Sequence, residues 1–245
     1  MPLAELFDLD LLAAAIAAVI GGWILGFTGF GAALVMTPAF TLLWGATVAV
    51  PTCLVLLVFS NAQLFLPAIR ACEPRTTAVL SLAACATIPL GSYLLLAVER
   101  SLMQRAIGAI VLLLTLALAA GFRHHGARTV PLSTGVGAIS GVLNGATGMG
   151  GPPVILYLLA GDDPAARIRA TLLTYYAVVN TVSLVALGIV GLLTWPILVR
   201  ALVMAPLYMI GIWVGARFFH RGGQDAYRRW AFAILFAIAI ATLVA

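Results

Sequence analysis

The chain has 245 residues, of which 63% are hydrophobic and only 9% charged, whereas about a quarter of the residues of an ordinary soluble domain are charged. This composition excludes a soluble globular domain, because stretches of about 20 apolar residues are typical of membrane-spanning helices and here they fill most of the chain. The net charge of +5 comes from thirteen arginines and eight acidic residues, scattered among short connections. A nucleic-acid-binding surface, which needs clustered positive charge, is not predicted, and the lipid bilayer is the expected surrounding.

Charged and turn-forming residues divide the chain into ten apolar segments. In chain order they cover 9–27, 32–44, 47–69, 76–97, 102–121, 131–147, 152–160, 168–190, 196–219 and 227–245. As helices, the segments at 32–44 and 152–160 would be only about 20 Å and about 14 Å long, less than the roughly 30 Å of the hydrocarbon layer. We therefore expect an all-α polytopic membrane protein with broken or re-entrant helices.

Arginines are distributed unevenly between alternate connections. Ten lie in the connections after the first, third, fifth, seventh and ninth segments, and three lie in the opposite set. Because cytoplasmic loops carry the positive excess, we expect both termini to be periplasmic and the linker at 123–130 to be cytoplasmic.

The two halves of the chain match when one is shifted by 119 residues. The matched residues are Gly22, Gly26, Thr28, Gly29, Gly31, Thr52 and Asn61 in the first half and Gly141, Gly145, Thr147, Gly148, Gly150, Thr171 and Asn180 in the second. An offset of 124 also places Gly91 and Arg105 on Gly215 and Arg229. The sequence thus predicts one transmembrane repeat at 1–122 and a second at 131–245. Five segments in each repeat imply that the second is inverted, a plan common among secondary transporters. A duplicated scaffold or enzyme is the alternative.

Both repeats contain a glycine-rich motif within apolar sequence, at 26–31 and at 145–151. Glycine weakens a helix, and irregular backbone at membrane depth requires a protein interior or a wet cavity. A helix that begins at such a break offers free N–H groups and the positive end of its dipole to an anion. The alternative is close helix packing, which we prefer for Gly22 and Gly141. The candidate binding residues at the breaks are Thr28, Gly29, Gly31, Thr147, Gly148, Gly150 and Gly151.

A matched pair of asparagines, Asn61 and Asn180, lies near the middle of two segments. The pair suits either hydrogen bonding between helices or substrate binding. The central parts of the segments contain no acidic, basic or histidine residue, and the three cysteines have no metal-binding spacing. We therefore predict no catalytic residue, no metal and no cofactor.

The motif Gly26-Phe-Thr-Gly-Phe-Gly31 with Pro38 downstream, and its second copy from Asn144 to Pro153, resemble the sulfite exporter TauE/SafE family over nearly the whole chain. Gly31-Ala32 replaces a Gly-Gly pair that is common in that family. The resemblance implies a multi-pass protein of the bacterial inner membrane that moves small anions, typically sulfite, sulfoacetate or related organosulfur compounds.

The predicted function is secondary transport of a small organosulfur or carboxylate anion by alternating access, at a site that includes Asn61, Asn180 and the two breaks. The alternatives are a membrane-embedded enzyme and a passive anion channel. The sequence leaves open the coupling ion, the direction of transport and whether the protein forms a homodimer.

Overall fold

A computed structural model of the protein describes residues 9–99, 129–159, 161 and 163–221, with the isolated positions 102, 105, 109 and 113. These residues form helices and no strands. The helices are α1 (Leu9–Thr28), α2 (Ala32–Trp44), α3 (Ala46–Ile69), α4 (Pro74–Ala97), α6 (Val130–Thr147), α7 (Gly151–Leu159), α8 (Ala165–Ile189) and α9 (Trp195–Arg221).

The predicted all-helical membrane fold is confirmed, and eight of the predicted segments coincide with these helices to within a few residues. Among the described residues, α1, α4, α8 and the part of α9 from Trp195 to Phe218 are long and apolar enough to cross a membrane. The predicted segments at 102–121 and 227–245 and the linker at 123–130 lie wholly or largely outside the described residues.

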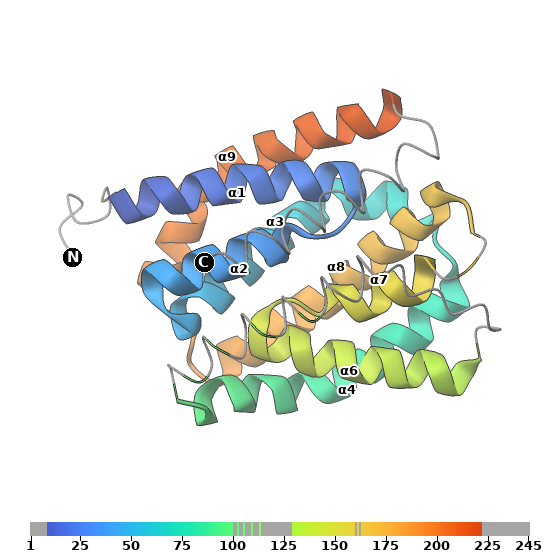
Figure 1. Ribbon diagram of the computed structural model, residues 1–245, viewed down its shortest axis with the longest axis horizontal. Helices are drawn as coiled ribbons and strands as arrows, with labels where there is room; N and C mark the ends of the chain where they lie inside the picture. The colour runs from blue at the N-terminus through green and yellow to red at the C-terminus, as the bar shows by residue number, and fades with distance from the viewer. Residues whose placement is uncertain are drawn as a thin grey trace.

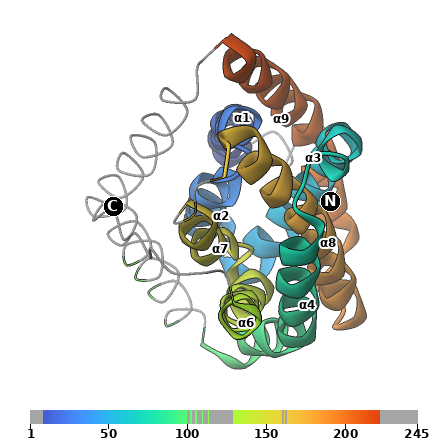
Figure 2. The same cartoon turned by 90° about the vertical axis from the view of Figure 1, so that its right-hand side faces the viewer.

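The helices form a bundle with a paired helix layer on each side. Figure 1 shows α1 beside α9 at one edge and α4 beside α6 at the other, and α2, α3, α7 and α8 lie between these pairs. The view along the bundle in Figure 2 shows the same order. The buried apolar core lies among the central helices and includes Phe40, Leu54 and Tyr175.

Each short helix folds back on the helix before it. In the first hairpin, a β-carbon at Gly21 of α1 would lie 2.9 Å from Met36 Cγ of α2. In the second, the hydroxyls of Ser133 at the start of α6 and Tyr157 near the end of α7 are 2.6 Å apart. The glycine-rich motifs are therefore the tips of two helical hairpins. At 13 and 9 residues, the returning helices are shorter than a full membrane crossing.

The two hairpins pack on opposite edge helices through glycine contacts. A β-carbon at Gly26 of α1 would collide with the Ile212 carbonyl of α9, and one at Gly145 of α6 would collide with the Ile88 carbonyl of α4. Gly22 and Gly141 face the same two helices, which confirms their packing role. Under the 119- and 124-residue shifts, α1 on α9 corresponds to α6 on α4, so the first helix of each half packs on the fourth helix of the other. The inverted orientation of the halves across a membrane stays a prediction.

Candidate functional site

The two helix breaks share one local hydrogen-bond pattern, built by a threonine. In the first, Thr28 Oγ1 donates to the Ile24 carbonyl at 2.8 Å and accepts from the Phe30 N–H at 3.2 Å. In the second, Thr147 Oγ1 donates to the Leu143 carbonyl at 2.7 Å and accepts from the Met149 N–H at 3.1 Å. Both threonines are fully buried. Each hydroxyl thus supplies an acceptor for an N–H group just beyond the end of its helix.

The residue after each threonine ends its helix in the left-handed conformation. Gly29 has φ +82° and Gly148 has φ +71°, and their N–H groups bond the carbonyls of Leu25 and Asn144 at 2.7 Å and 2.8 Å. Side chains are disfavoured at such φ values, so glycine is the natural residue for this type of helix end. The chain turns sharply at both positions. The short returning helices, α2 and α7, begin shortly afterwards.

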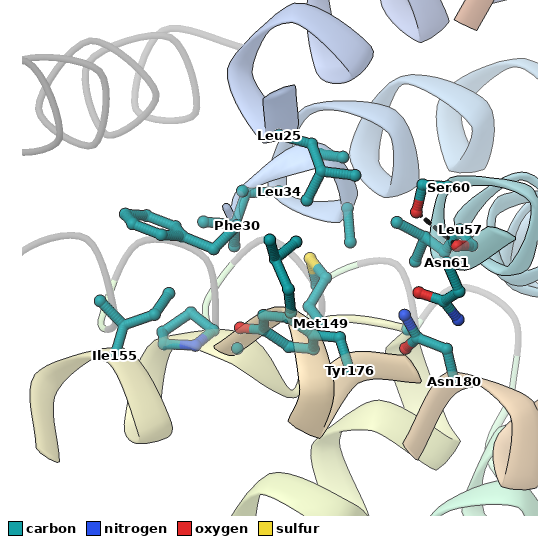
Figure 3. Close-up of a pocket in the computed structure, with 17 residues that line it drawn as sticks. Leu25, Phe30, Leu34, Leu57, Ser60, Asn61, Met149, Ile155, Tyr176 and Asn180 are labelled. Carbon is teal, nitrogen blue, oxygen red and sulfur yellow. Dashed lines mark hydrogen bonds between the residues drawn. The ribbon is translucent and has the colours of Figure 1, made fainter. Parts of the chain in front are cut away.

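One pocket lies where the two breaks and the central helices meet. Figure 3 shows its lining side chains, which come from both halves of the chain. Most of the wall is apolar, and the polar side chains are Ser60, Asn61, Tyr176 and Asn180. No acidic or basic residue is among the described lining residues. The lining residues are Leu25, Phe30, Gly31, Ala32, Ala33, Leu34, Leu57, Ser60, Asn61, Gly148, Met149, Gly151, Pro152, Ile155, Leu173, Tyr176 and Asn180.

The asparagine pair predicted from the repeat meets at the polar end of this pocket. Asn61 of α3 and Asn180 of α8 lie at equal distances from the starts of their helices, and Figure 3 shows their carboxamides facing each other. Asn180 is 3% exposed. Asn61 Nδ2 also donates to the Ala177 carbonyl of α8, at the long distance of 3.5 Å. The arrangement is compatible with both interpretations of the pair, contact between helices and contact with a ligand.

Five of the nine residues predicted for the site line the pocket. These are Gly31, Asn61, Gly148, Gly151 and Asn180. The other four, Thr28, Gly29, Thr147 and Gly150, lie within the breaks but are not lining residues. The structure thus brings the two breaks and both asparagines together around one cavity.

The sequence matches one family over nearly its whole length. The family model described as Sulfite exporter TauE/SafE matches residues 14–242. The chain belongs to the sulfite exporter TauE/SafE family. It is therefore a multi-pass membrane protein of a transporter family, as the apolar helices also indicate. No curated protein and no solved structure gives a significant match.

Two polar residues of this TauE/SafE protein contact the breaks without having been predicted as site residues. Asn144, in α6, accepts from the Gly150 N–H at 3.1 Å and donates to Asn180 Oδ1 at 3.3 Å. Arg169, in the first turns of α8, donates to the Gly26 carbonyl at 2.7 Å. Asn144 has Leu25 at its repeat position, and Arg169 has Val50, so a search for matched residues overlooks both. A buried amide within an apolar segment is the signal that could have indicated Asn144.

Within the described part of the chain, no three His, Cys, Asp or Glu side chains are grouped so that they could hold a metal ion. The candidate site of the TauE/SafE protein therefore consists of backbone groups, amides and hydroxyls in an apolar wall.

Proposed function

We propose that the protein is a secondary transporter that moves a small anion across the bacterial inner membrane by alternating access, with the pocket as its binding site. Sulfite, sulfoacetate and other small organosulfur or carboxylate anions are the proposed substrates. The observation that carries the proposal is the meeting of both helix breaks and both repeat-related asparagines at one cavity of a TauE/SafE protein. Binding sites at broken helices between two related halves are typical of secondary transporters.

The start of α2 supplies backbone donors for an anion. Ala32 and Ala33 both line the pocket, and N–H groups in the first turn of a helix have no carbonyl partner within it. The positive end of the helix dipole points the same way. The start of α7 offers fewer donors, because Pro152 and Pro153 have no N–H. We therefore expect the first break to contribute more backbone hydrogen bonds to the anion than the second.

The wall of the pocket limits the charge that a substrate can carry. Burying an ion away from water costs much free energy unless hydrogen bonds or opposite charges compensate. The described lining residues offer amides, hydroxyls and backbone groups but no arginine. We expect singly charged anions such as hydrogen sulfite or short monocarboxylates to bind more tightly than doubly charged anions such as sulfate and sulfoacetate. The apolar wall suits the carbon-bearing part of such a substrate.

The packing of the halves supports a rocking movement. The first helix of each hairpin packs on the fourth helix of the other half, α1 on α9 and α6 on α4. Residues of both hairpins line the pocket. Movement of one hairpin and its edge helix against the other would open the pocket to one side of the membrane at a time. This is the expected basis of alternating access in an inverted-repeat protein.

A thermal-shift screen of the detergent-purified protein tests the binding site. The anions are sulfite, sulfate, thiosulfate, sulfoacetate, taurine and short carboxylates, and a ligand that binds only the folded state raises the melting temperature. Counterflow in proteoliposomes then separates a carrier from a channel, since trans-side substrate accelerates exchange only in a carrier. Absence of any thermal shift across the series contradicts the proposed function. Flux without saturation or counterflow favours the passive channel.

A further inference from the structure

The chain has three asparagines in 245 residues, and the structure brings all three together. Asn61 and Asn180 line the pocket. Asn144, which lies behind them in α6, is hydrogen-bonded to Asn180. Buried amides in an otherwise apolar bundle are costly unless every polar atom is paired, so their concentration at one place points to a specific task.

The amide orientation of Asn144 is fixed from its far end. A backbone N–H can only donate a hydrogen bond, and the Gly150 N–H lies 3.1 Å from the Asn144 side chain. The atom of Asn144 that faces Gly150 must therefore be its oxygen. Its nitrogen then donates to Ser183 Oγ at 2.9 Å and to Asn180 Oδ1 at 3.3 Å. Asn144 is 1% exposed, and its carboxamide uses both hydrogens and an oxygen lone pair within the protein.

This sequence of hydrogen bonds also fixes the orientation of Asn180. Because Asn144 can offer only N–H groups on that side, Asn180 turns its oxygen to Asn144 and its nitrogen away from it. Figure 3 shows the nitrogen of Asn180 on the side that faces Asn61 across the pocket. The Gly150 N–H at the second helix break thus fixes the orientation of Asn144. Asn144 in turn fixes Asn180, so that an amide N–H of Asn180 faces the pocket.

We propose that Asn144 is a positioning residue that makes Asn180 a hydrogen-bond donor towards the pocket, so that this end of the site selects an oxyanion over a cation or a donor group. The inference rests on the proposed function, because it specifies how the same pocket recognises its anion. The proposed role belongs to the second half alone. Leu25 occupies the position of Asn144 in the first half, and a leucine side chain cannot orient Asn61 by a hydrogen bond.

Two substitutions at Asn144 test the positioning role. Asn144→Leu installs the residue of the first half, and Asn144→Asp keeps the acceptor for Gly150 but removes the amide donor to Asn180. A hydrogen bond to a charged ligand is worth about ten- to a hundredfold in affinity, so each variant should bind sulfite or sulfoacetate at least about tenfold more weakly. Ser133→Ala is the matched control, because it removes a buried α6–α7 hydrogen bond away from the pocket.

A double-mutant cycle separates positioning from general damage. If Asn144 acts through Asn180, Asn144→Leu should cause little further loss of affinity in an Asn180→Leu background, since contacting residues that act together are not additive. Full additivity of the two losses overturns the proposal. So does unchanged affinity in both Asn144 variants while the parent protein binds the anion, and in that case the proposed function stands.

A spectroscopic measurement tests the relay, which is the set of hydrogen bonds from Gly150 through Asn144 to Asn180, without any ligand. Selective labelling of asparagine side chains with nitrogen-15 gives three NH₂ groups, one for each asparagine, and Asn180→Leu identifies the signal of Asn180. Asn144→Leu should shift that signal, and Ser133→Ala should leave it in place. If the parent protein binds none of the anions, the proposed function fails. The relay is then judged by this shift alone, and an unmoved Asn180 signal overturns it.

Discussion

The guanidinium of Arg169, near the start of α8, donates a 2.7 Å hydrogen bond to the carbonyl oxygen of Gly26, near the end of α1. The last carbonyls of a helix have no partner within it and carry the negative end of its dipole. A β-carbon at the adjacent Gly29 would lie 2.7 Å from Arg169 Cγ, so the arginine stem also covers the tip of the first break. The Arg169 contact therefore links α1 of the first hairpin to α8, the helix that carries Asn180.

Arg169→Gln should destabilise the protein, because it removes a cation from the end of α1 and leaves the carbonyl of the buried Gly26 less well paired. We expect a loss of about 1–2 kcal/mol in the free energy of unfolding, measured by denaturant titration in detergent. Arg167→Gln is the control, since Arg167 is exposed and pairs with Asp163 of its own segment at 3.4 Å. Equal effects of the two substitutions would show that the Gly26 contact contributes nothing.

Gly145→Ala should destabilise the packing of α6 on α4, whereas Gly135→Ala in the same helix should not. The added methyl group at Gly145 would collide with the Ile88 carbonyl, but no described residue lies within 4 Å of a β-carbon at Gly135. Overpacking costs about 1–3 kcal/mol, and alanine favours a helix over glycine by up to about 1 kcal/mol. The two variants should therefore shift the melting temperature in opposite directions. A shift of the same sign in both would contradict the described contact.

Asn61→Ala and Asn180→Ala should each reduce transport more than they reduce folding. Both side chains line the pocket, and loss of a hydrogen bond to a charged substrate is expected to lower initial rates at low substrate by about tenfold or more. Thr134→Ala is the control, because Thr134 is exposed and its hydroxyl bonds the Val130 carbonyl of its own helix. A variant that transports and expresses normally would identify its asparagine as a contact between helices only.

Gly148→Val should lower anion affinity, and loop arginines should affect mainly the salt dependence of the rate. At φ +71° a side chain strains the backbone by about 1–2 kcal/mol, although the nearest atom to a β-carbon, Thr37 Oγ1, is 3.7 Å away. Arg123→Gln and Arg128→Gln should change delivery of the anion, which ionic strength screens. Binding and initial rates in proteoliposomes at two ionic strengths distinguish these effects. Normal binding by Gly148→Val, with a loop arginine essential for affinity at high salt, would place the site at the cytoplasmic rim.

Cys72 should react with a membrane-impermeant maleimide from the cytoplasmic side only. It lines a groove in which Arg70, before α4, meets Arg167, at the start of α8, so the structure places two arginine-bearing connections together. The positive-inside rule assigns both to the cytoplasm. A Cys85→Ser background leaves Cys53, which is fully buried, as the other thiol. Labelling of Cys72 in intact cells, before the membrane is opened, would reverse the proposed topology.

Much of the fold follows from the sequence because it depends on local properties. Apolar length predicts where each helix begins and ends, and the glycines at 29 and 148 predict where α1 and α6 stop. The shift of 119 residues also predicts that Asn61 and Asn180 are equivalent. None of these conclusions requires knowing which helices touch.

The tertiary structure alone decides which of these residues share a cavity and which serve the breaks. Thr28 and Thr147 lie in the motifs, yet their hydroxyls bond the backbone. Asn144 and Arg169 reach partners 36 and 143 residues away in the chain. Such contacts depend on how whole helices pack, and in a chain that is apolar almost throughout the same hydrophobic pattern suits several packings. The close fit of glycines on backbone carbonyls selects one of them, and with it the residues that face the pocket.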